Sequence, residues 1–549
     1  MFWIFFFLLI PNSIQVEQPV GRNGHWDVDD PRWDTEIPNW WEEDIFVPPN
    51  GPKEEKSRKF WVDQGQEFLN KKLKQKLNTN KAKNLVIFIG DGMGLSTQMA
   101  ARAYKEDVRS ELAFETFPFS GLSKTYCVNY QVPDSGCTGN AILTGIKNNY
   151  ATIGVTGDVN LRNCTAEQEE GNNIDSIFKY AQEAGKATGI VTNTRITHAT
   201  PAAGYANTAS RYWESNEGVP EGCHDIAYQL VHGEVGKNID VIMGGGRRSF
   251  YPNTFVNEKL ERGARTDNRN LIDEYKKVQK SLNKRAAYIQ TKNQLLSLRP
   301  ADTDRVLGLF AHSHLEYKLL SQGLNQPTLA EMTEKALEML RNNERGFVLL
   351  IEGGRIDHAH HDTLARQALE ETLEFEKAVE VVKKKTNEED TLVVVTADHS
   401  HVFTVGGYPP RSQNILGVGD YSRSDQMWMF TLSYANGPGY LNHTSPSGGR
   451  LNPRGMNYMS SSFRQPATVN KIEETHAGED VGVYASGPFA HIFSGVYEQN
   501  FICHAMAYAT CLGPEDFEKH PDCEENSSYT NKMSIEMLIS SILIKFAIS

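Results

Sequence analysis

Five short apolar runs recur along the chain, each bounded by glycine or by a polar residue. They are NLVIFIG (84–90), TGIVT (188–192), DVIMGGG (240–246), GFVLLIEGG (346–354) and TLVVVTAD (391–398). Apolar residues follow one another within these runs instead of alternating with polar ones, which predicts strands buried on both faces. Intervening helical stretches, such as 328–341 and 364–384, are suited to cover such a sheet. The pattern therefore predicts an α/β fold.

Two other regions have a different character. From about 54 to 77, apolar residues at helical spacing among many charges predict a helix. From about 404 to 475, the chain becomes rich in Gly, Ser, Pro, Asn and Tyr, with few long apolar runs. This shift indicates an inserted, loop-rich subdomain.

The N-terminus begins with MFWIFFFLLI, an apolar run too short to span a bilayer. It predicts a secretory signal peptide over residues 1–15. Residues 16–53 form an acidic extension rich in proline and tryptophan, whose tryptophans predict burial against the body or a partner subunit. A disordered tail is the alternative interpretation.

The C-terminus ends in the thirteen-residue apolar run MLISSILIKFAIS, shorter than the roughly twenty residues of a spanning helix. Small residues at 526–528 and a polar spacer precede it. This layout predicts a GPI-anchor signal over residues 526–549, with a packed terminal helix as the alternative. Glycosylation sequons at Asn163, Asn442 and Asn526 fit an extracellular glycoprotein on the cell membrane, and a secreted form fits as well.

Charge and cysteine content narrow the function. Lys and Arg number 56 against 69 Asp and Glu, and this net charge of −13 argues against nucleic-acid binding. The seven cysteines include no CxxC pair, so they do not indicate a cysteine zinc site. Disulfides are the expectation in a secreted chain, and an odd count leaves at least one thiol over.

Three of the apolar runs end in acidic residues. NLVIFIG leads into Asp91, GFVLLI into Glu352, and TLVVVTA into Asp398 and His399. Because ligands of open α/β sheets bind at the carboxyl ends of the strands, these side chains are expected to meet. Carboxylates crowded in this way repel one another unless a cation lies between them.

Further metal ligands follow from spacing. Asp357 and His361 in GGRIDHAHHD are four residues apart and share a face of a helix or turn, and THAGED adds His476. Imidazole together with carboxylate suits zinc, whereas oxygen ligands suit magnesium. Seven ligands predict a site of two or three ions, although each residue alone could be a helix cap or an ordinary polar side chain.

The segment VPDSGCTGNAILTG places Ser135 at the start of a predicted helix of small residues. One interpretation is that this serine caps the helix and has no other role. A neighbouring metal ion gives it a second possible role, because the ion stabilises the alkoxide and makes the hydroxyl a nucleophile.

Long motifs make the sequence similar to the alkaline phosphatase family, of the eukaryotic, membrane-anchored type. They are NLVIFIGDGMG, VPDS, TRITHATPA, SRYWES, EGGRIDHAHH, TADHSHVF and THAGEDV, in family order over roughly residues 55–515. The resemblance implies a catalytic domain at 54–520 with a mostly parallel ten-stranded sheet between helices. It also implies a homodimer and a crown subdomain at about 404–475.

The resemblance implies the site residues as well. Ser135 resembles the nucleophile that becomes phosphoserine, and Arg211 the residue that holds the substrate phosphate. Two zinc ions and one magnesium ion per subunit are implied. Their ligands would be Asp357, His361 and His476 for one zinc, Asp91, Asp398 and His399 for the other, and Asp91, Glu352 and Thr200 for magnesium.

Cysteine alignment within the resemblance pairs Cys164 with Cys223 and Cys511 with Cys523, and it leaves Cys127, Cys137 and Cys503 unassigned. The segment after Ser135 departs from the family pattern, with Asn140 among the differing residues.

The function expected from the resemblance is hydrolysis of phosphate monoesters at alkaline pH with release of inorganic phosphate. A phosphodiesterase on the same metal-site fold is one alternative. A surface-anchored binding protein with impaired catalysis is another, motivated by the altered 136–144 segment.

Overall fold

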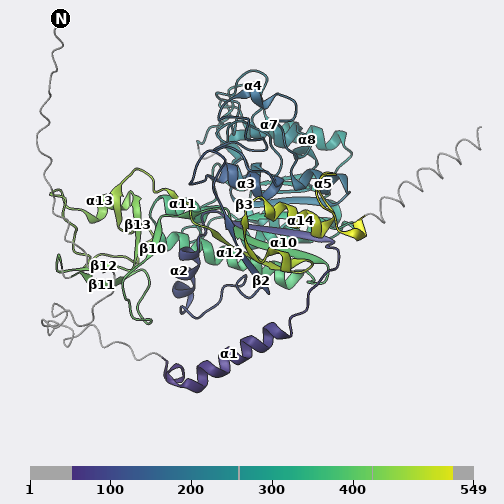
Figure 1. Cartoon of the computed structure of the whole chain (residues 1–549). Helices are drawn as coiled ribbons and strands as arrows, with labels where there is room; N and C mark the ends of the chain where they lie inside the picture. Colours follow the sequence, from purple (N-terminus) through teal and green to yellow (C-terminus); the bar gives the residue numbers. More distant parts are fainter. Residues whose placement is uncertain (1–51, 258–259, 423, 524–549) are drawn as a thin grey trace, which may run out of the picture. The chain divides into compact units, whose positions relative to one another are not determined.

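A ten-stranded sheet lies within residues 57–549, the larger of two units into which the chain divides (Figure 1). The five apolar runs of the sequence are its neighbouring strands β8, β1, β7, β3 and β4. Strand β16 is antiparallel to both its neighbours, and the other adjacent pairs of this sheet are parallel. In sheet order the strands are β17 (Gly495–Glu498), β2 (Phe119–Lys124), β16 (Val481–Ser486), β8 (Thr391–Ala397), β1 (Asn84–Gly90), β7 (Phe347–Glu352), β3 (Ala187–Arg195), β4 (Val241–Gly245), β6 (Arg305–Leu309) and β5 (Ala286–Ile289).

Both faces of this sheet are covered by helices. In β1, Val86 and Phe88 belong to one core, while Leu85, Ile87 and Ile89 belong to the core on the opposite face. Helices α2 (Leu95–Lys105), α10 (Leu329–Leu340) and α12 (Ala365–Lys385) pack on the first core. Helices α5 (Ile177–Glu183), α7 (Ile226–His232) and α14 (Phe501–Thr510) pack on the second. This three-layer arrangement confirms the predicted α/β fold.

The predicted helices are present, with boundaries close to those expected. The stretch at 328–341 is α10, which begins after Thr328 in a capping box with Glu331. The stretches at 364–384 and 54–77 hold α12 and α1. The helices are α1 (Arg58–Leu73), α2 (Leu95–Lys105), α3 (Ser135–Thr144), α4 (Cys164–Glu167), α5 (Ile177–Glu183), α6 (Ala199–Ala202), α7 (Ile226–His232), α8 (Leu271–Ser281), α9 (Lys292–Ser297), α10 (Leu329–Leu340), α11 (Arg355–His361), α12 (Ala365–Lys385), α13 (Gly439–His443) and α14 (Phe501–Thr510).

The loop-rich region at about 404–475 contains two small sheets. One is formed by β10 (Phe403–Val405), β13 (Leu432–Gly437) and β14 (Ala467–Asn470), and the other by β11 (Val418–Ser422) and β12 (Met427–Phe430). A further pair, β9 (Ser400–His401) and β15 (His476–Ala477), joins the end of this region to the loop that follows β8. The limits of a crown subdomain here stay a prediction.

The computed structural model describes residues 52–257, 260–422 and 424–523. The predicted signal peptide (1–15), nearly all of the extension (16–53) and the anchor signal (526–549) lie outside the described residues. Within the described ranges no helix combines the length and the apolar character needed to cross a bilayer.

Three disulfides are formed among the described cysteines. Cys164–Cys223 and Cys511–Cys523 confirm the pairing implied by the resemblance. The third, Cys127–Cys137, joins two cysteines that the sequence left unassigned. Cys503 is a buried free thiol.

Candidate functional site

Adjacent strands of the main sheet bring the predicted acidic residues together. β1 lies between β7 and β8, with Ile89 opposite Glu352 and Gly90 opposite Ala397. Asp91, Glu352, Asp398 and His399, which end these strands or follow them, are completely buried. The glycine after Asp91 allows the close approach, because a Cβ on Gly92 would lie 2.4 Å from His401 Nε2.

A first group of ligand atoms consists of Asp357, His361 and His476. His361 donates its Nδ1 proton to the Glu474 carbonyl at 2.6 Å, and His476 donates its Nδ1 proton to the Pro133 carbonyl at 2.7 Å. In neutral rings both Nε2 atoms are then hydrogen-bond acceptors, yet they lie only 3.1 Å from each other. Asp357 Oδ1 lies 3.3 Å from His361 Nε2 and 3.2 Å from His476 Nε2. Three acceptors converging on one point fit a cation.

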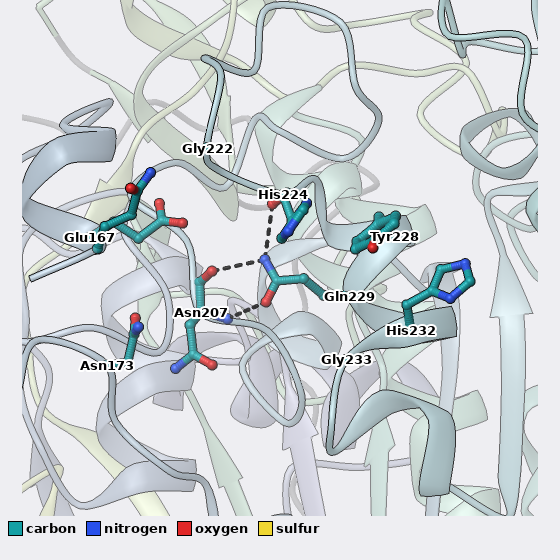
Figure 2. A pocket seen from close by; sticks show the side chains of 10 residues that line it. Glu167, Asn173, Asn207, Gly222, His224, Tyr228, Gln229, His232 and Gly233 are labelled. Atoms are coloured by element: carbon teal, nitrogen blue, oxygen red, sulfur yellow. Dashed lines mark hydrogen bonds between the residues drawn. The ribbon is translucent and has the colours of Figure 1, made fainter. Parts of the chain in front are cut away.

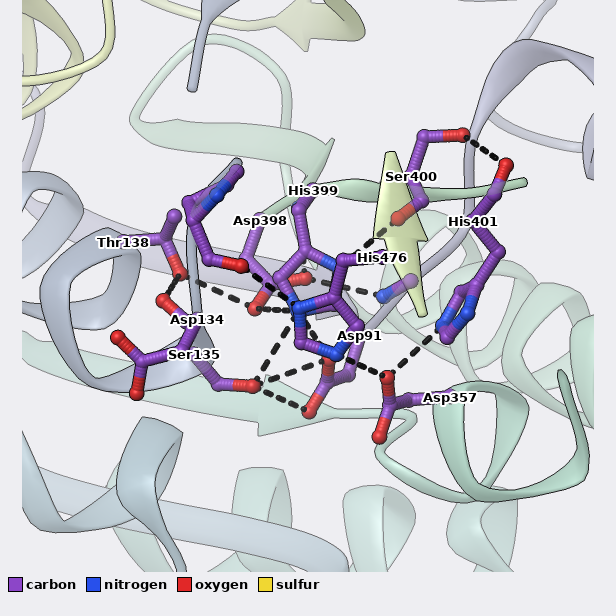
Figure 3. Close-up of polar contacts among 12 residues, drawn as sticks. Asp91, Asp134, Ser135, Thr138, Asp357, Asp398, His399, Ser400, His401 and His476 are labelled. Carbon is purple, nitrogen blue, oxygen red and sulfur yellow. Dashed lines mark hydrogen bonds and ion pairs between the residues drawn. The ribbon is translucent and has the colours of Figure 1, made fainter. Parts of the chain in front are cut away.

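A second group surrounds the Ser135 hydroxyl (Figure 3). His399 Nε2 lies 3.3 Å from both Asp91 Oδ1 and Asp398 Oδ2, while its Nδ1 is near the Ser400 carbonyl. Ser135 Oγ is 3.4 Å from each Asp91 oxygen and 3.3 Å from His399 Nε2. This second set of acceptors fits a cation that would also contact the serine.

A third group is formed around Glu352. Thr192 and Thr194 donate to its Oε2, whereas Glu352 Oε1 and Thr200 Oγ1 are buried without a hydrogen-bond partner in the described part of the chain. Asp91 and His198 have ligand atoms close to Glu352, and His198 was not predicted. Unpartnered buried oxygens beside a shared carboxylate fit a hard cation such as magnesium.

The pKa values of these side chains in the metal-free protein are consistent with cation binding by the three groups. Burial raises the pKa of Asp91 well above its ordinary value, and the nearby Asp357, Asp398 and Glu352 raise it further. Burial also raises the pKa of Glu352 to about 7 and lowers the pKa of His399. Bound cations would reverse this tendency by stabilising the carboxylates and accepting the imidazole lone pair.

The helix start that carries Ser135 corrects the capping interpretation. The N-cap of α3 is Asp134, whose carboxylate accepts from the amides of Gly136 and Cys137, and Ser135 is the first helical residue. The serine therefore does not serve as the cap. Asn140, the unusual residue further along α3, is buried and bonds to the Ile146 carbonyl and the Gly154 amide, which makes it a structural link.

Asp134 also orients Arg211. Asp134 Oδ2 accepts from Arg211 Nη1 at 2.8 Å, and Arg211 Nη2 is 3.2 Å from His198 Nε2. The structure thus brings Arg211 next to the N-terminus of α3, where backbone amides and the guanidinium together favour an anion.

Polar side chains fix the segment that precedes Arg211. Glu167 accepts from the Ala209 amide at 2.6 Å, and the Gln229 amide group bonds to both backbone groups of Asn207. Glu167, Asn207 and Gln229 line a cavity of about 410 Å³ that the catalytic candidates do not share (Figure 2). These contacts support the segment from outside the metal cluster.

His401 and Glu474 lie among the candidate ligands, and the sequence did not single them out. His401 Nε2 lies 2.8 Å from Asp357 Oδ1, and its Nδ1 lies 2.5 Å from Glu474 Oε2. Burial acts to lower the pKa of His401, but Glu474 and Asp357 raise it to about 10. The pairing of β9 with β15 places His401 opposite His476. The sequence signal that could have identified His401 is its place as the second histidine of DHSH.

Replacing His401 with glutamine is expected to weaken metal retention about 10- to 100-fold, because a partner that orients a metal ligand has effects of this size. Asp357 would lose its 2.8 Å contact and its fixed orientation. The measurement is metal content after dialysis against graded chelator. His443→Gln removes another buried histidine, bonded to the Arg464 carbonyl, and should retain metal as wild type does. Equal retention in both variants would contradict the orienting role of His401.

Glu352 predicts how the stability of the metal-free protein depends on pH. Its pKa rises from the ordinary 4.5 to about 7 on folding, so the folded state holds the extra proton between these values. Stability should then fall as pH rises through this window, by on the order of 3 kcal/mol from this group. Thermal unfolding of metal-free wild type and Glu352→Gln from pH 4.5 to 7.5 tests this. The wild type should lose more stability than the variant, and parallel curves would contradict the assignment.

Comparison with known proteins gives a consistent result. Residues 82–512 match the family profile described as alkaline phosphatase. The chain is 45% identical over 480 residues to the tissue-nonspecific alkaline phosphatase of Rattus norvegicus, which covers 84% of this chain and 90% of the relative. It is 43% identical over 484 residues to the membrane-bound alkaline phosphatase of Bombyx mori, covering 84% and 86%. The alkaline phosphatase structure from Thermus thermophilus superposes with a TM-score of 0.57 at 23% identity, covering 80% of this chain and 93% of that one.

Proposed function

Because the chain belongs to the alkaline phosphatase family, and is thus a phosphoric monoester hydrolase with metal-binding clusters, we propose that it acts through a phosphoserine intermediate on Ser135. The observation that carries the proposal is the position of the Ser135 hydroxyl, 3.3 to 3.4 Å from His399 and Asp91. Arg211 lies beside the same helix start.

We assign each of the three ligand groups to one cation. Zinc would be held by Asp357, His361 and His476 and by Asp91, Asp398 and His399, because these groups combine imidazole with carboxylate. Magnesium would be held by Asp91, Glu352 and Thr200, whose donors are all oxygens. Bound cations would lower the pKa of the serine hydroxyl and of water, and would offset the charge of the phosphate.

The residues of the chain then have distinct tasks. Arg211 binds two oxygens of the substrate phosphate, with its guanidinium fixed by Asp134. The Ser135 hydroxyl loses its proton to solvent, and Oγ forms a bond to phosphorus as the bond to the alcohol oxygen breaks. The released alkoxide takes up a proton from solvent. Water then loses a proton and attacks phosphorus from the vacated side, and the bond between phosphorus and Ser135 Oγ breaks. Oγ takes up a proton, which restores the serine hydroxyl and frees inorganic phosphate. At alkaline pH the carboxylate and imidazole ligands are deprotonated and able to bind cations, which favours this chemistry.

Replacing Arg211 with alanine is expected to raise the inhibition constant of inorganic phosphate roughly 10- to 100-fold, because a bidentate, charge-assisted contact is lost. The test uses p-nitrophenyl phosphate as substrate and phosphate as competitor. Arg269→Ala is the control, since Arg269 is also partly buried and paired with a carboxylate, that of Glu274. It should leave phosphate inhibition unchanged.

The same assay with bis(p-nitrophenyl) phosphate addresses the diesterase alternative. A monoesterase should prefer the monoester, whose doubly charged phosphate gains most from Arg211 and the cations. A preference for the diester that persists in Arg211→Ala would contradict the proposal.

We further propose that the enzyme is a homodimer held by a GPI anchor on the extracellular face of the cell membrane. The small residues, polar spacer and apolar run of 526–549 support the anchor, and the Bombyx mori relative is described as membrane-bound. The dimer rests on the family resemblance. Release of the protein by a phosphatidylinositol-specific phospholipase C would support the anchor.

A further inference from the structure

The Cys127–Cys137 disulfide closes a loop directly at the proposed nucleophile. Cys137 is the third residue of α3, two positions after Ser135, and both half-cystines are buried. Their Cα atoms lie 5.7 Å apart across a sequence separation of ten. The bridge therefore ties the start of the nucleophile helix to the segment that leads into it.

The first half of this loop has little burial to hold it in place. Residues 128–132 are all exposed, including Val128 at 55% and Tyr130 at 57%. Two of its hydrogen bonds reach one short segment: the Val128 amide donates to the Asn148 carbonyl, and the Asn129 side chain accepts from the Tyr150 amide. Because this half of the loop buries so little apolar surface, covalent closure adds a constraint that packing alone does not supply.

The second half of the loop supports three parts of the site. It carries Ser135 itself. Its Pro133 carbonyl accepts from His476 Nδ1 at 2.7 Å, and its Asp134 carboxylate accepts from Arg211 at 2.8 Å. A shift of this backbone would move the nucleophile, a metal ligand and the phosphate-binding arginine together.

Both sulfur atoms contact Asp134. Cys127 Sγ is 3.9 Å from Asp134 Oδ1, and Cys137 Sγ is 3.4 Å from the Asp134 carbonyl oxygen. The same carboxylate accepts from the Cys137 amide and from the Ala151 amide. The disulfide is thus packed against the side chain that both caps α3 and orients Arg211.

We propose that the Cys127–Cys137 disulfide is a positioning element of the active site, which holds Asp134 so that Arg211 is aimed at the substrate phosphate. The proposal rests on the proposed function, in which Arg211 binds that phosphate. The bridge acts on phosphate affinity through Arg211, and it acts on turnover through Ser135.

The test compares Cys127→Ala/Cys137→Ala with the matched variant Cys511→Ala/Cys523→Ala, which loses a bridge of similar separation, twelve residues. Both are made as full-length, metal-loaded protein, and KM and kcat for p-nitrophenyl phosphate, the inhibition constant of inorganic phosphate, and Tm are measured. The first variant should show an inhibition constant raised about tenfold, as expected when a charge-assisted contact is misaligned. The control should keep the wild-type constant whatever its Tm.

A double-mutant cycle separates positioning from general damage. In an Arg211→Ala background, loss of Cys127–Cys137 should change the inhibition constant less than about twofold, because the contact it supports is already absent. A full tenfold effect in that background, or equal effects of the two cysteine pairs, would overturn the proposal. If Arg211→Ala alone leaves phosphate inhibition unchanged, the proposed function fails instead.

Should the alanine pair fail to fold, wild-type protein reduced with a phosphine and alkylated serves as the second measurement. Modification at Cys127 and Cys137 is quantified by peptide mass spectrometry, and modification at Cys511 and Cys523 provides the internal comparison. Phosphate inhibition should weaken in step with modification of the first pair. Inhibition that stays constant as this pair is modified would contradict the positioning role.

Discussion

Replacing Ser135 with alanine is expected to lower kcat for phosphate monoesters by at least ~10³-fold, as removal of a covalent nucleophile does in other hydrolases. The hydroxyl lies 3.3 to 3.4 Å from His399 and Asp91, and its loss removes the oxygen that would attack phosphorus. Phosphate binding should persist, because Asp134 and Arg211 remain. The measurement is the steady-state rate with p-nitrophenyl phosphate, alongside phosphate binding by calorimetry.

Ser123→Ala is a matched control for this change. Ser123 is also buried, and its hydroxyl has no hydrogen-bond partner within the described ranges, but it lies on β2 at the far side of β16 from the metal ligands. Loss of this hydroxyl should leave kcat within about twofold of the wild-type value, because Ser123 lies outside the reacting groups. Ser135→Ala protein that is folded, metal-loaded and fully active would contradict the assignment of the nucleophile.

Removal of the metal ions is expected to abolish activity and to lower Tm. Asp91, Asp398 and Glu352 are completely buried, and without cations burial and the repulsion of neighbouring carboxylates raise the pKa of Asp91 well above its ordinary value. Extended dialysis against EDTA should reduce the rate by at least ~10³-fold, since cations supply both nucleophile activation and charge stabilisation. The rate and the metal content by mass spectrometry are followed together.

Add-back of individual ions distinguishes the three ligand groups. Zinc alone should restore a large part of the activity, and magnesium with zinc should restore the rest. In Thr200→Val, which keeps the shape of the side chain but removes the buried hydroxyl, the magnesium increment should disappear while the zinc response remains. Full activity in protein shown to be free of metal would contradict the metal-based account.

The central part of the fold could be predicted because burial on both faces has a clear sequence signature. The runs that became β1, β3, β4, β7 and β8 contain consecutive apolar residues and are buried almost throughout. Strands at or near the edges of the sheet lack that signature. β2 has the sequence FSGLSK and β17 the sequence GVYE, both largely half-buried or exposed, so they resemble loops. β6 is fully buried but has only five residues, one of them arginine. The count of ten strands came from the family resemblance.

The grouping of the candidate ligands was predictable where they follow strands and less so where it depends on pairing between distant segments. Asp91, Glu352 and Asp398 follow from the strand ends alone. His401 and Glu474 act through Asp357, and their relation depends on the β9–β15 pairing, which two-residue strands do not reveal in a sequence. The Cys127–Cys137 bridge likewise has no spacing signature. The sequence does not indicate whether Asp134 or Ser135 is the N-cap of α3, and the structure assigns that role to Asp134.

The central claim is that Ser135 carries the phosphoryl group during turnover. Its most direct test is an acid quench of the metal-loaded enzyme during hydrolysis of a phosphate monoester, followed by peptide mass spectrometry. The account predicts one phosphoryl group on the peptide that contains Ser135, absent from Ser135→Ala. Turnover with phosphorylation at a different residue, or with inverted configuration at phosphorus and no phosphorylated peptide, would contradict it.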